Sequence, residues 1–145
     1  MKRAMTMAFF VLISAIGYSQ SQKLNISKKK VAINGYDPVS YFSDKPTEGN
    51  SGFTSTYQGA KYFFTSAVNK KTFEEDPAKY APQYGGWCAY AMGVDGSKVK
   101  INPETYKIIE GKLYLFYDFR NLNTLTLWNE NESQFKTQAD KYWNQ

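Results

Sequence analysis

The sequence predicts one compact domain of the α+β class, in which small antiparallel β-hairpins pack against helices and the C-terminal segment is helical. Two pairs of short alternating runs, each joined by a tight turn that contains glycine, predict the hairpins. Apolar residues at helical spacing predict the helical tail. The length of 145 residues is enough for one such domain with a modest core.

The N-terminal segment has the layout of a secretory signal, and we expect residues 1–19 to be a signal peptide. Lys2 and Arg3 supply the positive start, and an apolar core follows from residue 7 to about residue 16. This run is shorter than the roughly 20 residues that cross a bilayer. We therefore expect an exported protein, periplasmic or secreted, with no stable membrane span after signal removal. The alternative is a short N-terminal anchor that is never cut.

The lead-in to the domain is polar. We expect residues 20–30 to be loosely ordered and the domain proper to occupy residues 31–145. Residues 31–33 predict a short apolar strand. Pro38 then predicts the start of a helical turn, for which Asp37 is the expected cap.

The first hairpin is predicted by an alternating run at residues 53–57, a tight turn, and a return strand at residues 61–64. Ser66 is a good N-cap, so we expect a helix from there to about residue 75. A second short helical turn should then carry the chain to Pro82.

The second half of the chain contains the clearest hairpin. Residues 106–109 and 112–116 flank the pair Glu110-Gly111 and predict two strands. An alternating run at residues 98–101 predicts a further strand, and Asn102-Pro103 predicts a turn after it.

The tail is expected to be helical in two pieces. Leu122, Leu125 and Trp128 share one face of the first piece. Ser133 is the expected cap of the second piece, whose apolar face continues to Trp143.

Composition excludes several functions. The net charge of +5 is mild and no nucleic-acid motif is present, so no nucleic-acid partner is expected. The chain has no histidine, which excludes Ser-His-Asp and Cys-His hydrolase mechanisms and removes the commonest zinc ligand. A single cysteine means that no internal disulfide forms, so packing must hold the domain together.

That cysteine, Cys88, lies in the most unusual stretch of the sequence, residues 82–90. A double glycine there permits a tight turn, and Tyr84 and Tyr90 stand on either side of the thiol. One interpretation is a small buried side chain packed among aromatic rings. The other is a thiolate that binds a metal or reacts, and a thiolate suits copper(I), zinc or haem iron.

Asp37 and the tyrosines complete the candidate set. Asp37 either caps a local turn or acts as a ligand or acid–base group in a pocket near Cys88. The tyrosines either pack in the core or direct their hydroxyls into a polar pocket. The candidate ligand-binding residues are Asp37, Tyr41, Tyr84, Cys88 and Tyr90, and Cys88 is also the candidate metal ligand.

Three stretches carry a family resemblance: residues 35–42, residues 57–89, and residues 111–143. Together they resemble the exported YHS-domain proteins of bacteria, over about residues 31–143. Most members of this kind are described only by their domain, so the resemblance names a family without naming a reaction.

A related short form of the family occurs in heavy-metal transport and resistance proteins, carries cysteines, and is thought to bind metal. The matching positions in this chain are Ser40, Thr65 and Asn69, none of which is a strong soft-metal ligand. The sequence therefore departs from the metal-binding pattern at those positions, and a heavy-metal role does not follow from the name alone.

The function expected from these observations is an exported YHS-like module that binds a small ligand or a metal ion, with a pocket near Cys88, Asp37 and Tyr41. The cofactor is undefined, with a soft metal ion such as copper, zinc or iron as the candidate, and no protein partner is indicated. One alternative is a structural or interaction domain in which Cys88 is merely packed. The other is a thiol-dependent enzyme, which the missing histidine disfavours.

Overall fold

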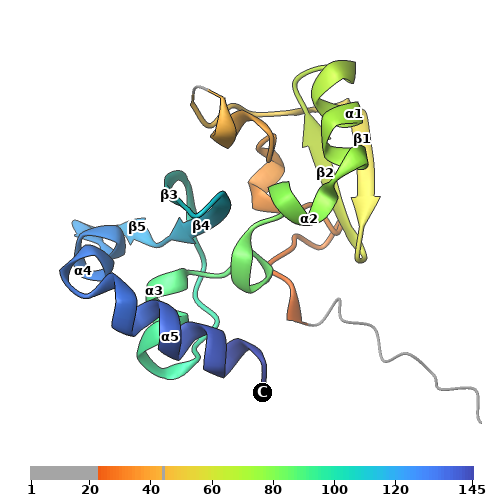
Figure 1. Cartoon of the computed structure of the whole chain (residues 1–145). Coiled ribbons are helices and arrows are strands. Elements are labelled where there is room, and N and C mark those ends of the chain that lie inside the picture. Colours follow the sequence, from red (N-terminus) through yellow and green to blue (C-terminus); the bar gives the residue numbers. More distant parts are fainter. Residues whose placement is uncertain (1–22, 44) are drawn as a thin grey trace, which may run out of the picture.

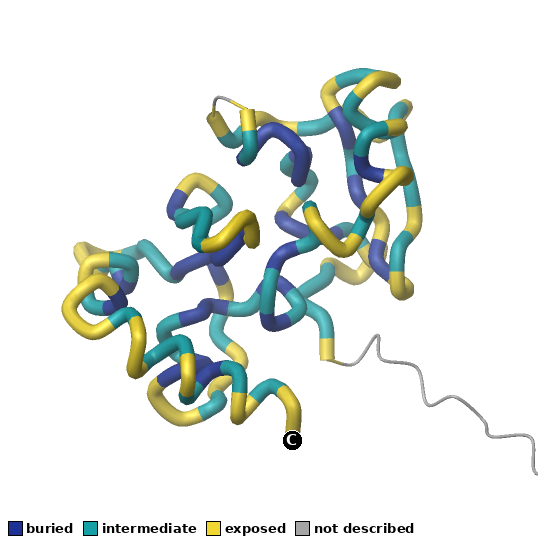
Figure 2. Tube along the Cα trace, in the orientation of Figure 1, coloured by how far each residue is buried: buried dark blue, intermediate teal, exposed yellow. Residues whose placement is uncertain are grey.

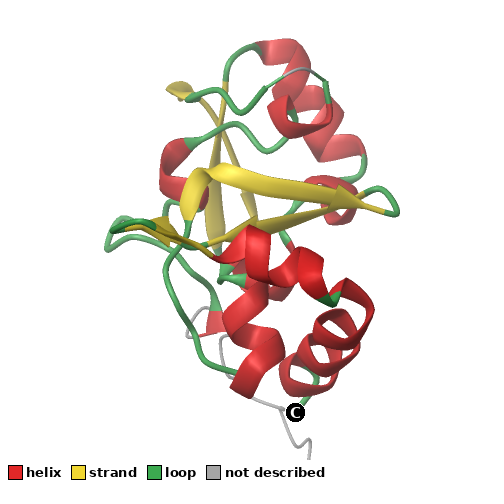
Figure 3. Cartoon of the chain, turned by 90° about the vertical axis from the view of Figure 1, so that its left-hand side faces the viewer, coloured by secondary structure: helices red, strands yellow, loops and turns green. Residues whose placement is uncertain are grey.

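The computed structural model describes residues 23–43 and 45–145, so the expected signal peptide at residues 1–19 lies outside the described residues. The described chain forms three two-stranded antiparallel sheets and a set of short helices, and the predicted α+β class is confirmed. The first hairpin and its helices lie on one side of the molecule, and the C-terminal helices lie on the other (Figure 1). Seen from the side, the strands occupy the middle, with helices above and below them (Figure 3).

The first group of elements is close to the prediction. It consists of η2 (Ile33–Gly35), η3 (Ser40–Phe42), β1 (Asn50–Tyr57), β2 (Ala60–Phe64), α1 (Ala67–Glu75) and α2 (Pro77–Tyr80). Ser66 caps α1 as predicted, because its hydroxyl accepts a hydrogen bond from the Asn69 N–H at 3.1 Å. The strand expected at residues 31–33 does not form. Val31 makes only an isolated bridge to Lys61, since the chain turns into η2 directly afterwards.

The second group contains η4 (Gln83–Gly86), α3 (Ala89–Asp95), β3 (Asn102–Ile109) and β4 (Lys112–Phe116). The hairpin around Glu110-Gly111 is confirmed. The run at residues 98–101 is not a strand: the carbonyl of Val99 accepts from the Cys88 N–H at 2.9 Å, and Ile101 is buried in the core. Its alternation therefore reflects packing, not pairing with a neighbouring strand.

Pro103 lies inside β3, where we had expected a turn. A register shift between Asn102 and Tyr106 accommodates it, and such an irregularity is where a strand tolerates a residue without an N–H donor.

The C-terminal part contains β5 (Asp118–Phe119), β6 (Leu122–Asn123), α4 (Thr124–Glu130) and α5 (Glu132–Trp143). Leu122 is not on the helix face predicted for it. It belongs to β6 and is 47% exposed, because Asn123 caps α4 by accepting from the Leu125 N–H at 2.9 Å. The cap expected at Ser133 is also wrong, since α5 begins one residue before it.

The lead-in, expected to be loosely ordered, is held against the domain from Lys23 onward. The Asn25 N–H donates to the Gly85 carbonyl at 2.8 Å, and the Asn25 amide donates to the Gly86 carbonyl at 2.9 Å. The Trp87 indole N–H donates to the Lys23 carbonyl at 2.6 Å. These bonds fix the lead-in beside the double glycine.

Strand β4 joins two hydrophobic clusters into one core. Its side chains alternate, so Leu113 and Leu115 enter the cluster that contains Phe73, whereas Tyr114 and Phe116 enter the cluster around Trp128. Both faces of the strand are buried, and buried segments run through the middle of the molecule (Figure 2). Within the part of the chain that the structure describes, no helix has the length and apolar character needed to cross a membrane.

Candidate functional site

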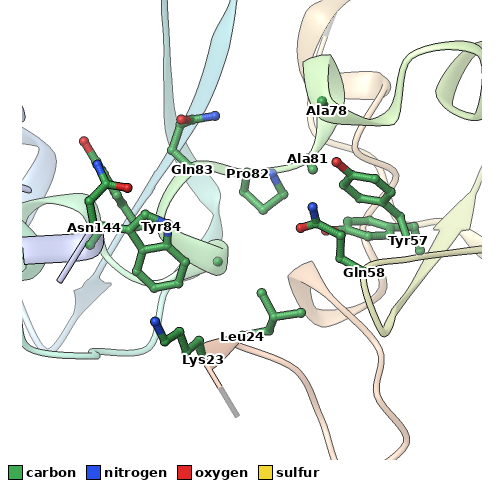
Figure 4. Close-up of a pocket in the computed structure, with 13 residues that line it drawn as sticks. Lys23, Leu24, Tyr57, Gln58, Ala78, Ala81, Pro82, Gln83, Tyr84 and Asn144 are labelled. Atoms are coloured by element: carbon green, nitrogen blue, oxygen red, sulfur yellow. The ribbon is translucent and has the colours of Figure 1, made fainter. Parts of the chain in front are cut away.

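The larger of the two main cavities, with a volume of about 450 Å³, lies where four separate segments meet. We call it the groove. Residues 23–24 form one edge, and the turn between β1 and β2 forms one wall with Tyr57 and Gln58. The opposite wall holds Tyr84, Trp143 and Asn144, while α2 and the start of η4 close the remaining side. Figure 4 shows Tyr57 and Gln58 facing Tyr84 and Asn144 across the open space.

The floor of the groove depends on the double glycine. Tyr84, Gly85 and Gly86 all have positive φ angles, of 55°, 61° and 83°. A Cβ atom at Gly85 would lie 2.8 Å from the Trp143 ring, closer than real Cβ atoms approach other groups, and 3.0 Å from the Lys23 carbonyl oxygen, which is tighter than most real Cβ contacts. Glycine therefore lets the lead-in and the end of α5 close on η4.

Tyr84 contributes its ring to the groove and uses its hydroxyl elsewhere. The hydroxyl donates to Asp140 Oδ1 at 2.7 Å, which ties η4 to α5. Burial, followed by this hydrogen bond, raises the pKa of Tyr84 far above its usual range, so the phenol stays protonated. Asp140 also accepts from Lys136 at 3.1 Å, and this hydrogen bond is the main cause that raises the pKa of Lys136.

Two half-buried rings of the groove, Tyr57 and Trp143, are held in place by aromatic neighbours. Tyr57 meets the buried ring of Phe73 edge-on, with centroids 6.1 Å apart, and Trp143 meets Tyr84 edge-on at 6.5 Å. Gln58 occupies the turn with a φ of 50°, a left-handed conformation that glycine adopts more readily than glutamine.

The second cavity, of about 300 Å³, is mainly apolar and contains Cys88. The thiol is fully buried, and its Sγ accepts from the Tyr117 N–H at 3.4 Å and lies 3.4 Å from the Thr124 hydroxyl oxygen. Tyr90 and Leu122 also line this pocket. The structure thus brings two of the five candidate residues, Cys88 and Tyr90, into one pocket.

Asp37 is fully buried in a polar cluster. Its Oδ1 accepts from the Val39 N–H at 2.8 Å, which is the local turn that the sequence predicted. Its Oδ2 accepts from the N–H and hydroxyl of Thr65, both at 2.9 Å, and from the Asn69 amide at 2.8 Å. Ser40 donates to the Asp37 backbone carbonyl at 2.6 Å. The three positions that the resemblance compares with cysteines therefore meet around Asp37, with Thr65 and Asn69 at its carboxylate and Ser40 at its backbone carbonyl.

This cluster does not fit a soft metal ion. Hydroxyl and amide groups replace thiolates, and four donors already occupy the carboxylate oxygens of Asp37. Among the residues that the structure describes, no group of three or more Cys, Asp or Glu side chains could hold a metal ion.

Tyr41 belongs to the core. Its hydroxyl donates to the Pro103 carbonyl at 2.5 Å, and its ring meets Tyr106 edge-on with centroids 5.0 Å apart. Burial raises the pKa of Tyr41 well above its usual range. Asp37 and Tyr41 line neither of the two cavities, whereas Tyr84 lines the groove.

Sequence reasoning did not identify most of the groove. Gln58, Lys23 and Trp143 come from a turn, the lead-in and the last turn of α5, which are far apart in the sequence. The double glycine at residues 85–86 was the local signal, because it marks a place where other backbone approaches closely.

The comparisons with known proteins agree with the resemblance. The family model of the YHS domain matches residues 39–84, which run from the start of η3 through the first hairpin to Tyr84. No curated protein and no solved structure matches the chain. The YHS domain is a family described as metal-binding modules. Residues 39–84 of the chain thus match the YHS domain.

Proposed function

We propose that the protein is an exported, non-catalytic module that binds a small organic ligand in the groove. The groove falls within the roughly 300–1,000 Å³ typical of small-molecule sites, and it combines aromatic rings with a few polar groups. Export rests on the signal-like layout of residues 1–19.

The observation that carries the proposal is the contact of the Trp143 ring and the Lys23 carbonyl with Gly85. Both groups sit where a side chain would otherwise be, so packing fixes the Lys23 edge and the Trp143 wall of the groove before any ligand arrives. A preformed site loses less freedom on binding than one that must fold around its ligand.

The same residues argue against catalysis. The groove is lined by no carboxylate and no thiol, and the chain has no histidine. Burial raises the pKa of Tyr62 and of Tyr84 well above the usual range, so neither phenol can exchange a proton readily near neutral pH.

Native mass spectrometry of the protein purified from its producing cell under mild conditions tests the proposal. We expect a small organic molecule bound at up to one per chain. Ala78→Trp places an indole at an exposed position that lines the groove, and this variant should lose the bound molecule. Ala67→Trp makes the same change at an exposed position of α1 outside the groove and should retain it. Equal retention by both variants would place the ligand elsewhere, and no bound molecule in any sample would count against the function.

The pocket at Cys88 supports a second candidate, the binding of a soft metal ion such as copper, zinc or iron. Cys88 is one of the residues that line this pocket, and the family is described as metal-binding. Because Thr124 supplies only a hydroxyl, further ligands would have to come with the metal. Elemental analysis and absorption spectra of the chelator-free protein and of Cys88→Ser test this candidate. Near-stoichiometric metal that disappears in the variant supports it, and metal-free samples leave Cys88 as a packing residue.

Export has its own test. Intact mass and N-terminal sequencing of the secreted or periplasmic protein should give a chain that begins at Gln20. An uncut chain recovered with the membrane fraction would instead support the N-terminal anchor.

A further inference from the structure

The charge of the groove restricts its ligand. Lys23 is the one lining side chain that carries a charge at neutral pH, since the rest of the lining consists of tyrosine, tryptophan, amide and apolar side chains. A cationic ligand would find no countercharge and would be repelled by the Lys23 ammonium group. The ligand should therefore be neutral or acidic.

The amides of the groove require a ligand with many hydrogen-bonding groups. Gln58, Gln83 and Asn144 each supply a carbonyl acceptor and an NH₂ donor. The amides of Gln58 and Gln83 make no hydrogen bond to any other residue within 23–43 and 45–145. A purely hydrocarbon ligand would cover these groups without pairing them, which is costly.

The rings require a ligand that also has an apolar face. Tyr57 and Trp143 are half-buried and stand on opposite walls, each fixed by its aromatic neighbour (Figure 4 shows the wall of Tyr57 facing that of Tyr84). Flat contact with an aromatic ring is favourable for a C–H surface, and fixed rings lose little freedom when it binds.

A saccharide ring has both properties, because its C–H face is apolar and its rim carries hydroxyl groups that donate and accept. We propose that the groove binds a neutral or acidic saccharide, with the sugar face on Tyr57 or Trp143 and its hydroxyls on the amides of Gln58 and Gln83. This inference rests on the proposed function and names the ligand class for the same site.

The backbone at Gln58 permits a substitution that isolates its amide. Its φ of 50° favours glycine, yet a long amide side chain stands there and projects into the groove wall. Replacement by glycine should remove the amide and preserve the turn.

Isothermal titration and saturation-transfer NMR on the purified protein test the inference with two sets of probes. The saccharides are glucose, N-acetylglucosamine and glucuronic acid, and the other probes are choline, benzoate and octanoate. We expect at least one saccharide to bind with a Kd of about 1 mM or tighter, and choline not to bind. Gln58→Gly and Gln83→Ala should each weaken saccharide binding by about tenfold. Val68→Ala, at a residue of α1 that is 72% exposed and lies outside the groove, should leave it unchanged.

The outcomes separate the ligand class from the proposed function. If benzoate or octanoate binds, the Gln variants weaken it, and no saccharide binds, the saccharide class is wrong and the groove remains the site. If a saccharide binds equally well to both Gln variants, the location is wrong. If no probe binds, the saccharide inference is overturned, and the native mass spectra of the Ala78→Trp pair still decide whether the groove holds a ligand.

Discussion

The Asn69 amide donates a hydrogen bond to the Asp37 carboxylate from 32 residues further along the chain, with Nδ2 and Oδ2 2.8 Å apart. Thr65 donates to the same oxygen from the end of β2. Asp37 therefore links the segment before η3 to α1. Thr65 and Asn69, two of the positions that the resemblance compares with cysteines, thus hold these segments together through hydrogen bonds.

Asp37→Asn should destabilise the protein by about 2–3 kcal/mol, because the new NH₂ group faces donors and leaves buried groups unpaired. Urea unfolding monitored by tryptophan fluorescence measures the change. Asp76→Asn is the matched control, since Asp76 is exposed and its side chain caps no helix. Equal stability of the two variants would show that the hydrogen bonds to Asp37 contribute nothing net.

Gly85→Ala should destabilise the protein more than Gly111→Ala does. Both glycines have positive φ, of 61° and 74°, so alanine costs about 1–2 kcal/mol at either position from the backbone alone. At Gly85 the added Cβ also meets Trp143 and the Lys23 carbonyl. At Gly111 the added Cβ would have no other residue's heavy atoms within 4 Å, chain neighbours aside. The clash should add about 1–3 kcal/mol. Thermal and urea unfolding of the two variants measures the loss of stability. Equal losses for Gly85→Ala and Gly111→Ala would contradict the close packing at Gly85.

Glu132 should make stability depend on pH in the acid range. The hydrogen bond from Lys107 is the main cause that lowers the pKa of Glu132 from its ordinary value of 4.5, and the Trp128 indole N–H, 3.0 Å from Oε2, adds to this effect. Because the pKa is lower in the folded state, the stabilisation is present above pH 4.5 and is lost as the pH falls through the folded pKa. The side chains of Lys107 and Glu132 are about one-third exposed, so solvent weakens their interaction. We therefore expect the pH-dependent contribution to the free energy of unfolding to be modest, about 0.5–1 kcal/mol.

Unfolding of Glu132→Gln and of the wild-type protein at several pH values measures this contribution. The variant should be less stable at neutral pH and equally stable at a pH below the folded pKa. Glu130→Gln, at an exposed residue of α4, should show no such convergence. If the stability difference between Glu132→Gln and the wild-type protein stayed the same in acid, the lost stability would not come from the charge of Glu132.

The Cys88 thiol should react slowly with Ellman's reagent while the protein is folded. It is fully buried, so reaction requires local or global opening, and we expect the rate to be at least about 100-fold below that of the unfolded chain in concentrated guanidinium. The unfolded protein serves as the control. Fast reaction of the folded protein would support the thiol-dependent enzyme that the sequence left as an alternative.

The sequence predicted the elements that are determined by interactions between residues close together in the chain. Tight turns with glycine and the cap at Ser66 act within a few residues, so the hairpins and α1 were predicted correctly. The run at residues 98–101 alternates like a strand, but its partner is the backbone of Cys88, which no sequence pattern could indicate. Ser133 was a good cap by residue type, yet α5 begins one residue earlier.

The candidate site was predicted only in part for the same reason. Cys88 and Tyr90 are two positions apart, and their shared pocket follows from their proximity in sequence. The local turn at Asp37 was also expected, whereas its bonds to Thr65 and Asn69 join distant segments. The groove needs the lead-in, a hairpin turn and the end of α5 together, and such an assembly is visible only in three dimensions.

Lys23 and Asn144 both border the groove, so the two ends of the described chain meet at one opening. An affinity tag or fusion partner joined after Gln145 would follow Asn144 almost directly, so it would stand at this entrance and could compete with a ligand or supply a false one. The turn at Glu110-Gly111 is exposed and lines neither cavity. A short peptide tag inserted there would allow purification and surface immobilisation with the entrance left open.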